Sequence, residues 1–215
     1  MHTSGGVREC QREDYPMNNQ QRAARRTFLK GIAALASICA GVTGRAFAQS
    51  SLAPTRACED DGEPTPPQTE GPFFSPNSPE RSNLLEPGEQ GTPIVLTGMV
   101  LTRSCRPVAG ALVELWHADA QGTYDNEGYR FRGHVFTDGH GTYRFETIVP
   151  GLYSGRTRHF HIKYQAPSQP VLTTQLYFPG EPNNVRDRIF HPDLLVGLDP
   201  NEPGVARFNA VLELA

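Results

Sequence analysis

Two histidines with one residue between them, His159 and His161, have a spacing that could hold a metal ion. The run over residues 160–164 is rich in residues that favour β-strands. Side chains two apart in a strand point to the same face, so both imidazoles could reach one ion while Phe160 and Ile162 face a core. A His-x-His pair can also be two hydrogen-bonded surface histidines, so the assignment depends on which other ligands lie nearby.

Two tyrosines on expected turns could supply further ligands. Tyr153 ends a turn-forming segment at 149–153, just before the histidine pair, and Tyr124 ends a Gln-Gly-Thr-Tyr turn at 121–124. A phenolate is a hard anionic donor that suits Fe(III). A bound cation can keep a phenol deprotonated at neutral pH although its ordinary pKa is about 10. These residue types suit a ferric site, whereas the Cys, His and carboxylate set typical of zinc is not evident.

Other residues compete for places in this set. Tyr129 is the more serious alternative to Tyr124, because Tyr143 lies in an alternating pattern typical of a packed strand. His117 and His134 lie in strand patterns without a partner at ligand spacing, so we expect structural roles for both. Roles in the core, in the pocket wall or in turns are expected for Trp116, Asp119, Asp138 and His191.

The order of these motifs resembles the intradiol ring-cleavage dioxygenases, and most closely the protocatechuate 3,4-dioxygenase type. The resemblance covers roughly residues 64–182, in order and with few gaps. The matching segments read QTEGPFF at 68–74, WHADAQGTY at 116–124, TDGHGTYRFETIVPGLY at 137–153, RTRHFHI at 156–162 and TTQLYF at 173–178.

The resemblance implies one Fe(III) ion and no organic cofactor. It implies a catecholic substrate that reacts with O2 and is opened between its two hydroxyl-bearing carbons to a cis,cis-muconate-type product. Both oxygen atoms enter the product, so no external reductant is needed. The implied iron ligands are Tyr124, Tyr153, His159 and His161.

The resemblance also implies catalytic roles for Arg156, Gln175 and Tyr153. Arg156 would stabilise negative charge that develops on the substrate, and Gln175 would orient substrate or oxygen. Tyr153 would leave the iron and take up a substrate proton. The family often has Pro-Ala between the arginine and the first histidine, where this chain has Thr157 and Arg158. Arg158 is therefore a second candidate for the arginine that faces the substrate.

Short strand signals separated by turn residues predict an all-β fold, with no long helical period. We expect a two-sheet antiparallel β-sandwich over residues 94–215, with an extended N-terminal arm at 49–93 and a loop-built metal site at one end. The 21 glycines and 19 prolines suit such a turn-rich fold. The expected strands are 94–101, 111–117, 131–136, 142–148, 160–165, 173–178 and 207–214.

The first 48 residues have the features of a twin-arginine export signal. Arg25 and Arg26 precede a mildly apolar run at 31–42, and Ala-Phe-Ala at 46–48 is a small-x-small cleavage pattern. The apolar run is shorter than the ~20 residues that a membrane span needs. We therefore expect an exported protein, periplasmic or extracellular, with no stable membrane span in its mature form.

The arm at 49–93 is rich in Pro, Glu and Ser, and we expect its residues 69–74 to lie near the mouth of the site. Cys58 and Cys105 could form a disulfide in an oxidising compartment, or remain free thiols. The formal net charge of −3 gives no sign of nucleic-acid binding. Self-association into a homo-oligomer stays open.

A second resemblance gives the alternative function. Gly98-x-Val100, followed by Cys-x-Pro-Val-x-Gly-Ala at 105–111, is similar to the opening of transthyretin-like and carboxypeptidase-associated sandwich domains. Those domains are non-catalytic, so the chain would be an exported binding module. They lack the Tyr/Tyr/His/His set. A third hypothesis is an exported iron- or catechol-binding protein that keeps these four ligands but has lost turnover.

Overall fold

The computed structural model describes residues 62–88 and 90–214, all within one compact unit, Ser51–Ala215. The predicted signal at 1–48 and Cys58 lie outside the described residues. Cys105 is disulfide-bonded, and its partner also lies outside them. No helix within the described residues is long and apolar enough to cross a membrane.

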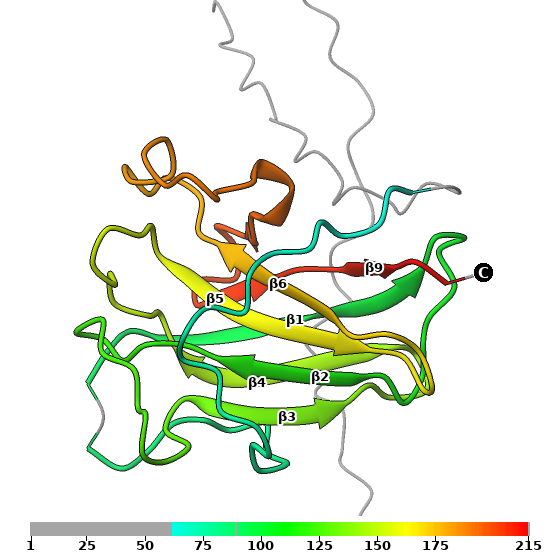
Figure 1. The fold of residues 1–215 in the computed structure, drawn as a ribbon, viewed down its shortest axis with the longest axis horizontal. Coiled ribbons are helices and arrows are strands. Elements are labelled where there is room, and N and C mark those ends of the chain that lie inside the picture. The colour runs from blue at the N-terminus through cyan, green and yellow to red at the C-terminus, as the bar shows by residue number, and fades with distance from the viewer. Residues whose placement is uncertain (1–61, 89, 215) are drawn as a thin grey trace, which may run out of the picture. The chain divides into compact units, whose positions relative to one another are not determined.

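Two β-sheets form the described domain, which confirms the predicted all-β sandwich (Figure 1). One turn of 3-10 helix, η1 at Pro192–Leu194, interrupts the strand order. The four-stranded sheet has the order β3-β2-β5-β6, from Arg132–Phe136, Leu112–Trp116, His159–Gln165 and Leu172–Tyr177. The other sheet has the order β4-β1-β8-β7 with β9 also on β1, from Thr142–Ile148, Pro93–Thr102, Val205–Arg207, Gly197–Leu198 and Ala210–Leu212.

The C-terminal strands differ in detail from the expected pattern. The four-stranded sheet is antiparallel throughout, but β8 and β9 both run parallel to β1. The strand expected over 207–214 is divided after Arg207, where the Asn209 side chain accepts a hydrogen bond from Met99 N–H at 3.0 Å. A side-chain oxygen therefore replaces a backbone partner at this point of the ladder.

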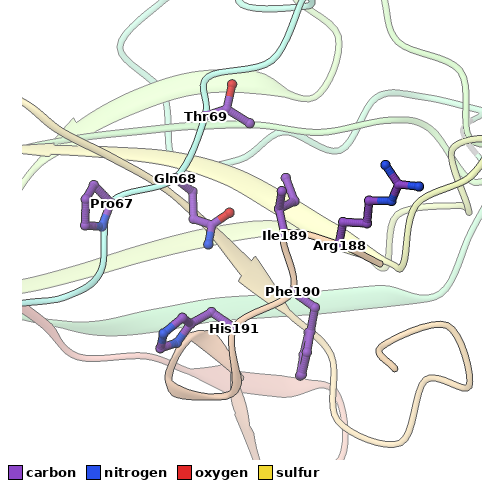
Figure 2. Close-up of a pocket in the computed structure, with 7 residues that line it drawn as sticks. All are labelled: Pro67, Gln68, Thr69, Arg188, Ile189, Phe190 and His191. Carbon is purple, nitrogen blue, oxygen red and sulfur yellow. The ribbon is translucent and has the colours of Figure 1, made fainter. Parts of the chain in front are cut away.

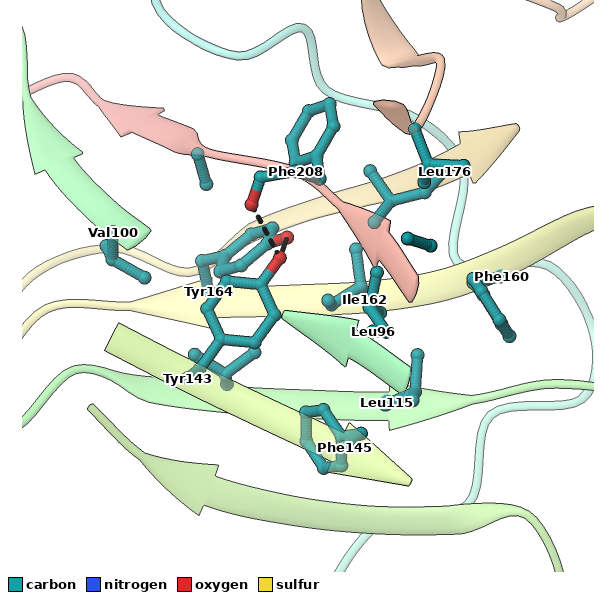
Figure 3. Packing of buried hydrophobic residues seen from close by; sticks show 14 of the residues in the cluster. Leu96, Val100, Leu115, Tyr143, Phe145, Phe160, Ile162, Tyr164, Leu176 and Phe208 are labelled. Atoms are coloured by element: carbon teal, nitrogen blue, oxygen red, sulfur yellow. Dashed lines mark hydrogen bonds between the residues drawn. The ribbon is translucent and has the colours of Figure 1, made fainter. Parts of the chain in front are cut away.

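The core lies between the sheets and is built from alternate residues of facing strands (Figure 3). Leu96 of β1, Leu115 of β2 and Phe145 of β4 are all fully buried in it. Phe160 and Ile162 of β5 also face the core, as the alternation predicts. His159 and His161 therefore lie on the opposite, outer face of the four-stranded sheet.

The N-terminal arm lies over this outer face, where the cyan segment crosses β6 and β5 in Figure 1. Gln68 N–H donates to Thr173 O at 2.9 Å, so this part of the arm runs along the free edge of β6. Lys163 of β5 forms an ion pair with Glu70, and its ammonium lies 3.1 Å from the centre of the Phe74 ring. These contacts fix residues 69–74 above the histidines, as expected from the sequence.

A groove separates the start of the arm from the loop before η1 (Figure 2). It has a volume of about 460 Å³. None of the predicted metal ligands lines it. Its lining residues are Pro67, Gln68, Thr69, Arg188, Ile189, Phe190 and His191.

Candidate functional site

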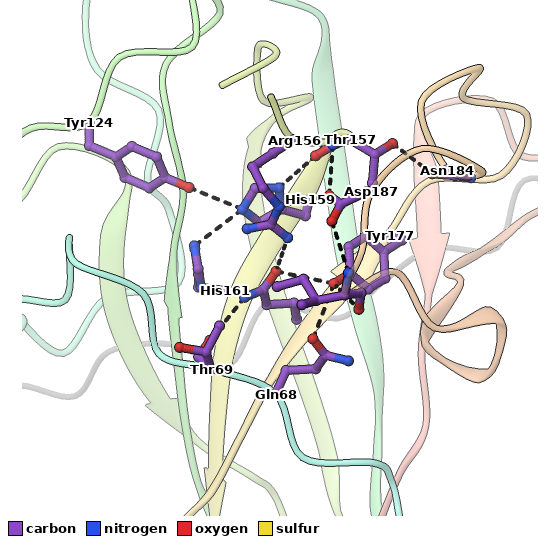
Figure 4. Close-up of polar contacts among 12 residues, drawn as sticks. Gln68, Thr69, Tyr124, Arg156, Thr157, His159, His161, Tyr177, Asn184 and Asp187 are labelled. Carbon is purple, nitrogen blue, oxygen red and sulfur yellow. Dashed lines mark hydrogen bonds and ion pairs between the residues drawn. The ribbon is translucent and has the colours of Figure 1, made fainter. Parts of the chain in front are cut away.

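The histidine pair begins β5 and is almost completely buried, with His159 4% and His161 2% exposed. The two Nε2 atoms lie 3.2 Å apart (Figure 4). Nδ1 of His159 donates to Thr157 O at 2.7 Å, which leaves its Nε2 with a lone pair directed at His161. The strand alternation and this backbone hydrogen bond therefore bring two imidazole nitrogens to one buried point.

The ring of His161 is held by packing. It pairs across the sheet with Trp116 of β2 and stacks on that indole, with ring centres 5.0 Å apart and planes 7° apart. On another side, a Cβ added to Gly71 of the arm would lie only 3.1 Å from its Cε1 atom. Nδ1 of His161 is buried without a hydrogen-bond partner in the described part of the chain. Stacking and the close arm therefore set the orientation of this imidazole.

Tyr124 completes a three-residue polar cluster with the histidines. Its hydroxyl lies 3.4 Å from Nε2 of His159, and the residue is 6% exposed. The preceding turn is shaped by the Asp119 carboxylate, which accepts two backbone N–H groups within it. Phe73 of the arm stacks on the phenol with ring centres 4.4 Å apart. The turn aims this tyrosine at the histidines, and the arm covers it.

Tyr153 lies beside Tyr124, on a loop that touches the Tyr124 turn directly. The ring centres of the two phenols are 5.8 Å apart with edge-on geometry, and Tyr153 is half-buried. Gly151 N–H donates to Asp119 O at 2.7 Å. A Cβ at Gly151 would lie 2.3 Å from the backbone nitrogen of Gly122, so only glycine permits this approach. The two tyrosine-bearing loops are thus joined backbone to backbone.

The competing tyrosines are placed elsewhere. Tyr129 is 40% exposed and its hydroxyl donates to Pro76 O at 3.2 Å, on the surface. Tyr143 is buried in the core, where its hydroxyl lies 3.1 Å from that of Tyr164 and donates to Phe208 O at 2.8 Å. Among the described tyrosines considered from the sequence, Tyr124 is the one whose hydroxyl reaches the histidine pair.

His117 and His134 have structural partners. His117 is 1% exposed; its Nδ1 donates to Ala118 O at 2.7 Å and its Nε2 accepts from the Thr147 hydroxyl at 2.6 Å. Burial lowers its pKa to about 4, so it is neutral at pH 7. His134 of β3 lies with its Nδ1 atom 3.2 Å from the Ser78 hydroxyl of the arm.

Burial also fixes the protonation of the cluster. It lowers the pKa of His159 to about 4 and that of His161 well below its usual value, so both are neutral at pH 7. Burial raises the pKa of the Tyr124 phenol well above its usual range, and the Arg156 charge only partly offsets this. Tyr124 is therefore a neutral phenol unless a cation lies at the point where the three side chains meet.

The donor set fits a metal ion that accepts imidazole and phenolate. No three His, Cys, Asp or Glu side chains gather into a metal-binding cluster within residues 62–88 and 90–214. The phenols of Tyr124 and Tyr153 are the oxygen donors that lie beside His159 and His161. Metal–nitrogen bonds in protein sites are about 2.0–2.1 Å long, so two nitrogen ligands at a right angle lie about 3 Å apart. The observed 3.2 Å between the two Nε2 atoms matches this separation.

Arg156 and Gln175 form a polar wall next to the histidines. Gln175 pairs with His161 across β5 and β6, so both side chains lie on the same face. Arg156 Nη2 donates to Gln175 Oε1 at 2.7 Å, and its Nε donates to Asp187 at 2.7 Å. Gln175 Nε2 donates to Thr69 O of the arm at 2.9 Å. One cationic group and one amide are thus fixed at the edge of the cluster.

Arg158, the other candidate for the substrate-facing arginine, is committed elsewhere. Its Nε donates to Glu181 at 2.7 Å, and it also donates to the Pro150 carbonyl. Its side chain is 23% exposed. Of the two arginines, Arg156 is the one in contact with Gln175.

Two residues of this region were not singled out from the sequence. Arg132 is 2% exposed and donates to Phe73 O and Asp125 O, each at 2.6 Å. It therefore ties the arm to the residue after Tyr124. Asp187 accepts from Arg156, as described above. Neither residue has a partner at a regular sequence spacing, so no local pattern could have identified them.

Part of this chain is similar to known dioxygenases. A family model described as dioxygenase matches residues 69–197. The protocatechuate 3,4-dioxygenase beta chain of Burkholderia cepacia is 36% identical over an alignment of 127 residues, and the match covers 50% of this chain and 54% of that protein. The chain spans about half the length of the curated relatives it matches.

Two solved structures resemble the described domain. The dioxygenase domain of a dioxygenase carbohydrate-binding protein fusion from the cellulolytic bacterium Streptomyces sp. SirexAA-E is 51% identical, with a TM-score of 0.69; the match covers 71% of this chain and 100% of that one. The 3-chlorocatechol 1,2-dioxygenase of Rhodococcus opacus 1CP is 28% identical with a TM-score of 0.65, over 70% and 73% of the two chains. These matches do not favour the transthyretin-like alternative.

Proposed function

We propose a ring-cleaving activity on the premise that this chain belongs to the intradiol ring-cleavage dioxygenase family. The dioxygenase family model matches more than half of its length. The substrate would be a catechol, opened by O2 between its two hydroxyl-bearing carbons to a cis,cis-muconate-type product. The observation that carries the proposal is the buried meeting of the Tyr124 hydroxyl with two facing imidazole nitrogens, at 3.4 and 3.2 Å.

Fe(III) is the proposed metal, held by Tyr124, Tyr153, His159 and His161. Phenolate oxygens are hard anionic donors, and they suit the ferric ion better than the ferrous ion or zinc. When bound, this ion would supply the Lewis acidity that removes the catechol protons and draws electron density from the ring. The buried Tyr124 needs such a charge to ionise, because its own surroundings favour the neutral phenol.

The two phenols would have different roles because their surroundings differ. Tyr124 is buried under Phe73, whereas Tyr153 is half-buried at the edge of the cluster. Tyr153 is therefore the phenol with room to move aside as a catechol enters, and its Oη would accept one of the two catechol protons. Tyr124 would remain in place.

Arg156 and Gln175 would act on the substrate. The guanidinium of Arg156 would stabilise negative charge that develops on the reacting oxygens, an interaction worth several kcal/mol in a site that excludes water. The Gln175 amide, fixed between Arg156 and the arm, would orient the substrate. The stacked ring of Phe73 and the arm backbone at Gly71 would exclude water from the metal ligands.

Oxygen uptake by iron-loaded protein tests this proposal, with catechol, protocatechuate and hydroxyquinol as substrates and with product absorbance recorded. The wild-type protein should be wine-red from phenolate-to-iron charge transfer, and Tyr124→Phe should change or abolish the colour. Tyr143→Phe is the matched control, because that phenol is buried in the core and bonds to Phe208 O. It should keep the colour.

A colourless protein that binds one zinc ion, or loss of colour in both tyrosine variants, would overturn the assignment. A red protein that consumes no oxygen with any of these substrates would instead support an iron- or catechol-binding protein without turnover. Arg156→Ala should lower turnover far more than iron content. Equal losses of both would indicate that Arg156 only stabilises the fold.

We also propose that the protein is exported through the twin-arginine route. The proposal rests on Arg25 and Arg26 ahead of the apolar run and on the disulfide at Cys105, a bond that persists in oxidising compartments. Changing both arginines to lysine should retain the protein in the cytoplasm, as measured by cell fractionation. Undiminished export of that variant would contradict the proposal.

A further inference from the structure

We propose that Asp187 is a positioning residue for this site. Its carboxylate holds Arg156 and, through the backbone of Thr157, sets the orientation of His159. The expected effects on turnover rest on the proposed function. The contacts of Asp187 with Arg156 and Thr157 do not depend on it. Asp187 comes from the loop between β6 and η1, far along the chain from the residues it holds.

The first contact is with the guanidinium. Asp187 Oδ2 accepts from Arg156 Nε at 2.7 Å, and the carboxylate is buried, with its side chain 2% exposed against 21% for Arg156. With Nε held, the guanidinium plane is fixed, and Nη2 is directed at Gln175 Oε1, 2.7 Å away. The direction in which Arg156 presents its charge therefore depends on Asp187.

The second contact leads to the metal ligand. The same Oδ2 atom also accepts Thr157 N–H at 2.9 Å. The carbonyl of Thr157 in turn accepts Nδ1–H of His159 at 2.7 Å. That hydrogen bond leaves Nε2 of His159 free to bind a metal ion. A change at Asp187 would therefore reach His159 through one residue of backbone.

Asp187 is itself firmly held. Its Oδ1 atom accepts Ile189 N–H at 3.2 Å, and its own N–H donates to Asn183 O at 3.0 Å. The neighbouring Asn184 accepts the Thr157 hydroxyl at 2.6 Å. Burial alone would raise the pKa of Asp187, but the hydrogen bonds from Thr157 N–H and Arg156 lower it, so the carboxylate is charged at pH 7. The loop presents a fixed anion to both contacts.

Asp187→Asn in the iron-loaded full chain tests both contacts. Turnover per bound iron reports on the contact with Arg156, and iron affinity reports on the contact with Thr157. The asparagine amide has a shape similar to that of the carboxylate but carries no charge, so the guanidinium of Arg156 should lose its fixed direction. We expect turnover per bound iron to fall about tenfold or more, with a smaller change in KM. Iron affinity, measured by competition with a chelator, should also fall about tenfold, because Thr157 and His159 are less well held.

A double variant shows whether Asp187 acts through the arginine. Adding Asp187→Asn to Arg156→Ala should lower turnover per iron by no more than about twofold, since the residue that Asp187 positions is already gone. Iron affinity should still fall in the double variant, because the contact with Thr157 is independent of Arg156.

Glu181→Gln is the matched control. Glu181 lies on the same loop and binds the Nε atom of Arg158 at 2.7 Å, the same distance as in the Asp187 pair. It should leave turnover and iron affinity within about twofold of wild type. The proposal is wrong if Asp187→Asn leaves either quantity within the range of this control, or if its effect on turnover multiplies with that of Arg156→Ala.

A measurement without iron separates this proposal from the proposed function. In iron-free protein, the Nε–H group of Arg156 should give a slowly exchanging nitrogen-15 NMR signal, assigned by its loss in Arg156→Lys. The signal should be lost in Asp187→Asn and kept in Glu181→Gln. If the signal is lost in Asp187→Asn and kept in Glu181→Gln but the wild-type protein opens no catechol, Asp187 positions Arg156 and the proposed function is wrong. A signal unchanged in Asp187→Asn overturns the positioning.

Discussion

Replacing Arg132 with methionine should loosen the N-terminal arm from the Tyr124 loop. Arg132 is 2% exposed and donates to two backbone carbonyls, Phe73 O at 2.6 Å and Asp125 O at 2.6 and 3.1 Å. Phe73 stacks on Tyr124, and Asp125 directly follows it. One side chain therefore joins the cover of the site to the segment that bears the phenol.

The expected cost follows from these contacts. Methionine fills much of the same volume but leaves both carbonyls without their donor, at about 1–3 kcal/mol for each buried group. Removing a buried charge returns part of its desolvation cost. We therefore expect the free energy of unfolding to fall by about 3 kcal/mol. In a domain of this size, that loss lowers Tm by about 6–12 °C.

Urea denaturation and amide hydrogen exchange would measure the effect. The Gln68 amide of the arm, bonded to Thr173 O at 2.9 Å, should exchange about 100-fold faster if the arm opens with a cost lowered by about 3 kcal/mol. Arg144→Met is the matched control, because Arg144 is 54% exposed and pairs only with Glu146 among the described residues. It should change stability by less than about 0.5 kcal/mol.

The reasoning is refuted if Arg132→Met unfolds at the same urea concentration as Arg144→Met and its Gln68 amide exchanges at the wild-type rate. That result would mean that the two carbonyls find other donors, such as water, at little cost. The arm would then be held by its remaining contacts.

Two further predictions concern the fold around the site. The folded pKa of His117, about 4, is lower than the usual value near 6.5, so its contribution to stability is complete above pH 6.5 and is lost as pH falls toward 4. The shift corresponds to about 3 kcal/mol, and His117→Asn should make the loss of stability between pH 7 and pH 4 smaller by up to that amount, in urea titrations at each pH. An equally steep loss in the variant would show that other groups cause it. Gly151→Ala should push the two tyrosine loops apart, because its Cβ would lie 2.3 Å from Gly122 N. We expect iron affinity to fall about tenfold or more. The control Gly139→Ala should leave iron affinity unchanged, because no atom lies within 4 Å of the added Cβ. Unaltered iron binding in Gly151→Ala would mean that the contact between the loops does not position the ligands.

The strands of the sandwich were predictable because local patterns determine them. Residues 142–148 and 160–165 alternate in a way that only a strand can bury, and the structure has β4 at Thr142–Ile148 and β5 at His159–Gln165. The end of the chain was less predictable. A contact between Asn209 and Met99, more than 100 residues apart, divides the last expected strand, and no local signal reports it.

Two nearly identical turns show where local sequence stops being informative. Asp119 and Asp138 each begin an Asp-x-x-Gly-Thr-Tyr segment, and in both the carboxylate accepts two backbone N–H groups of the turn. The second turn leads into β4, so Tyr143 points into the core and donates to a backbone carbonyl. The first leads into no strand, and its Tyr124 lies against the histidine pair.

The sequence by itself determined the strands, the turns and the face shared by His159 and His161, because periodicity and turn chemistry act over a few neighbouring residues. It also carried the motif order that led to the family. The resemblance favoured Tyr124 and Arg156, but only the tertiary structure showed that Tyr124 rather than Tyr129 meets the histidines. It also showed that Arg156 rather than Arg158 reaches Gln175. Those choices depend on which segments the two sheets bring together, and such contacts leave no periodic trace along the chain.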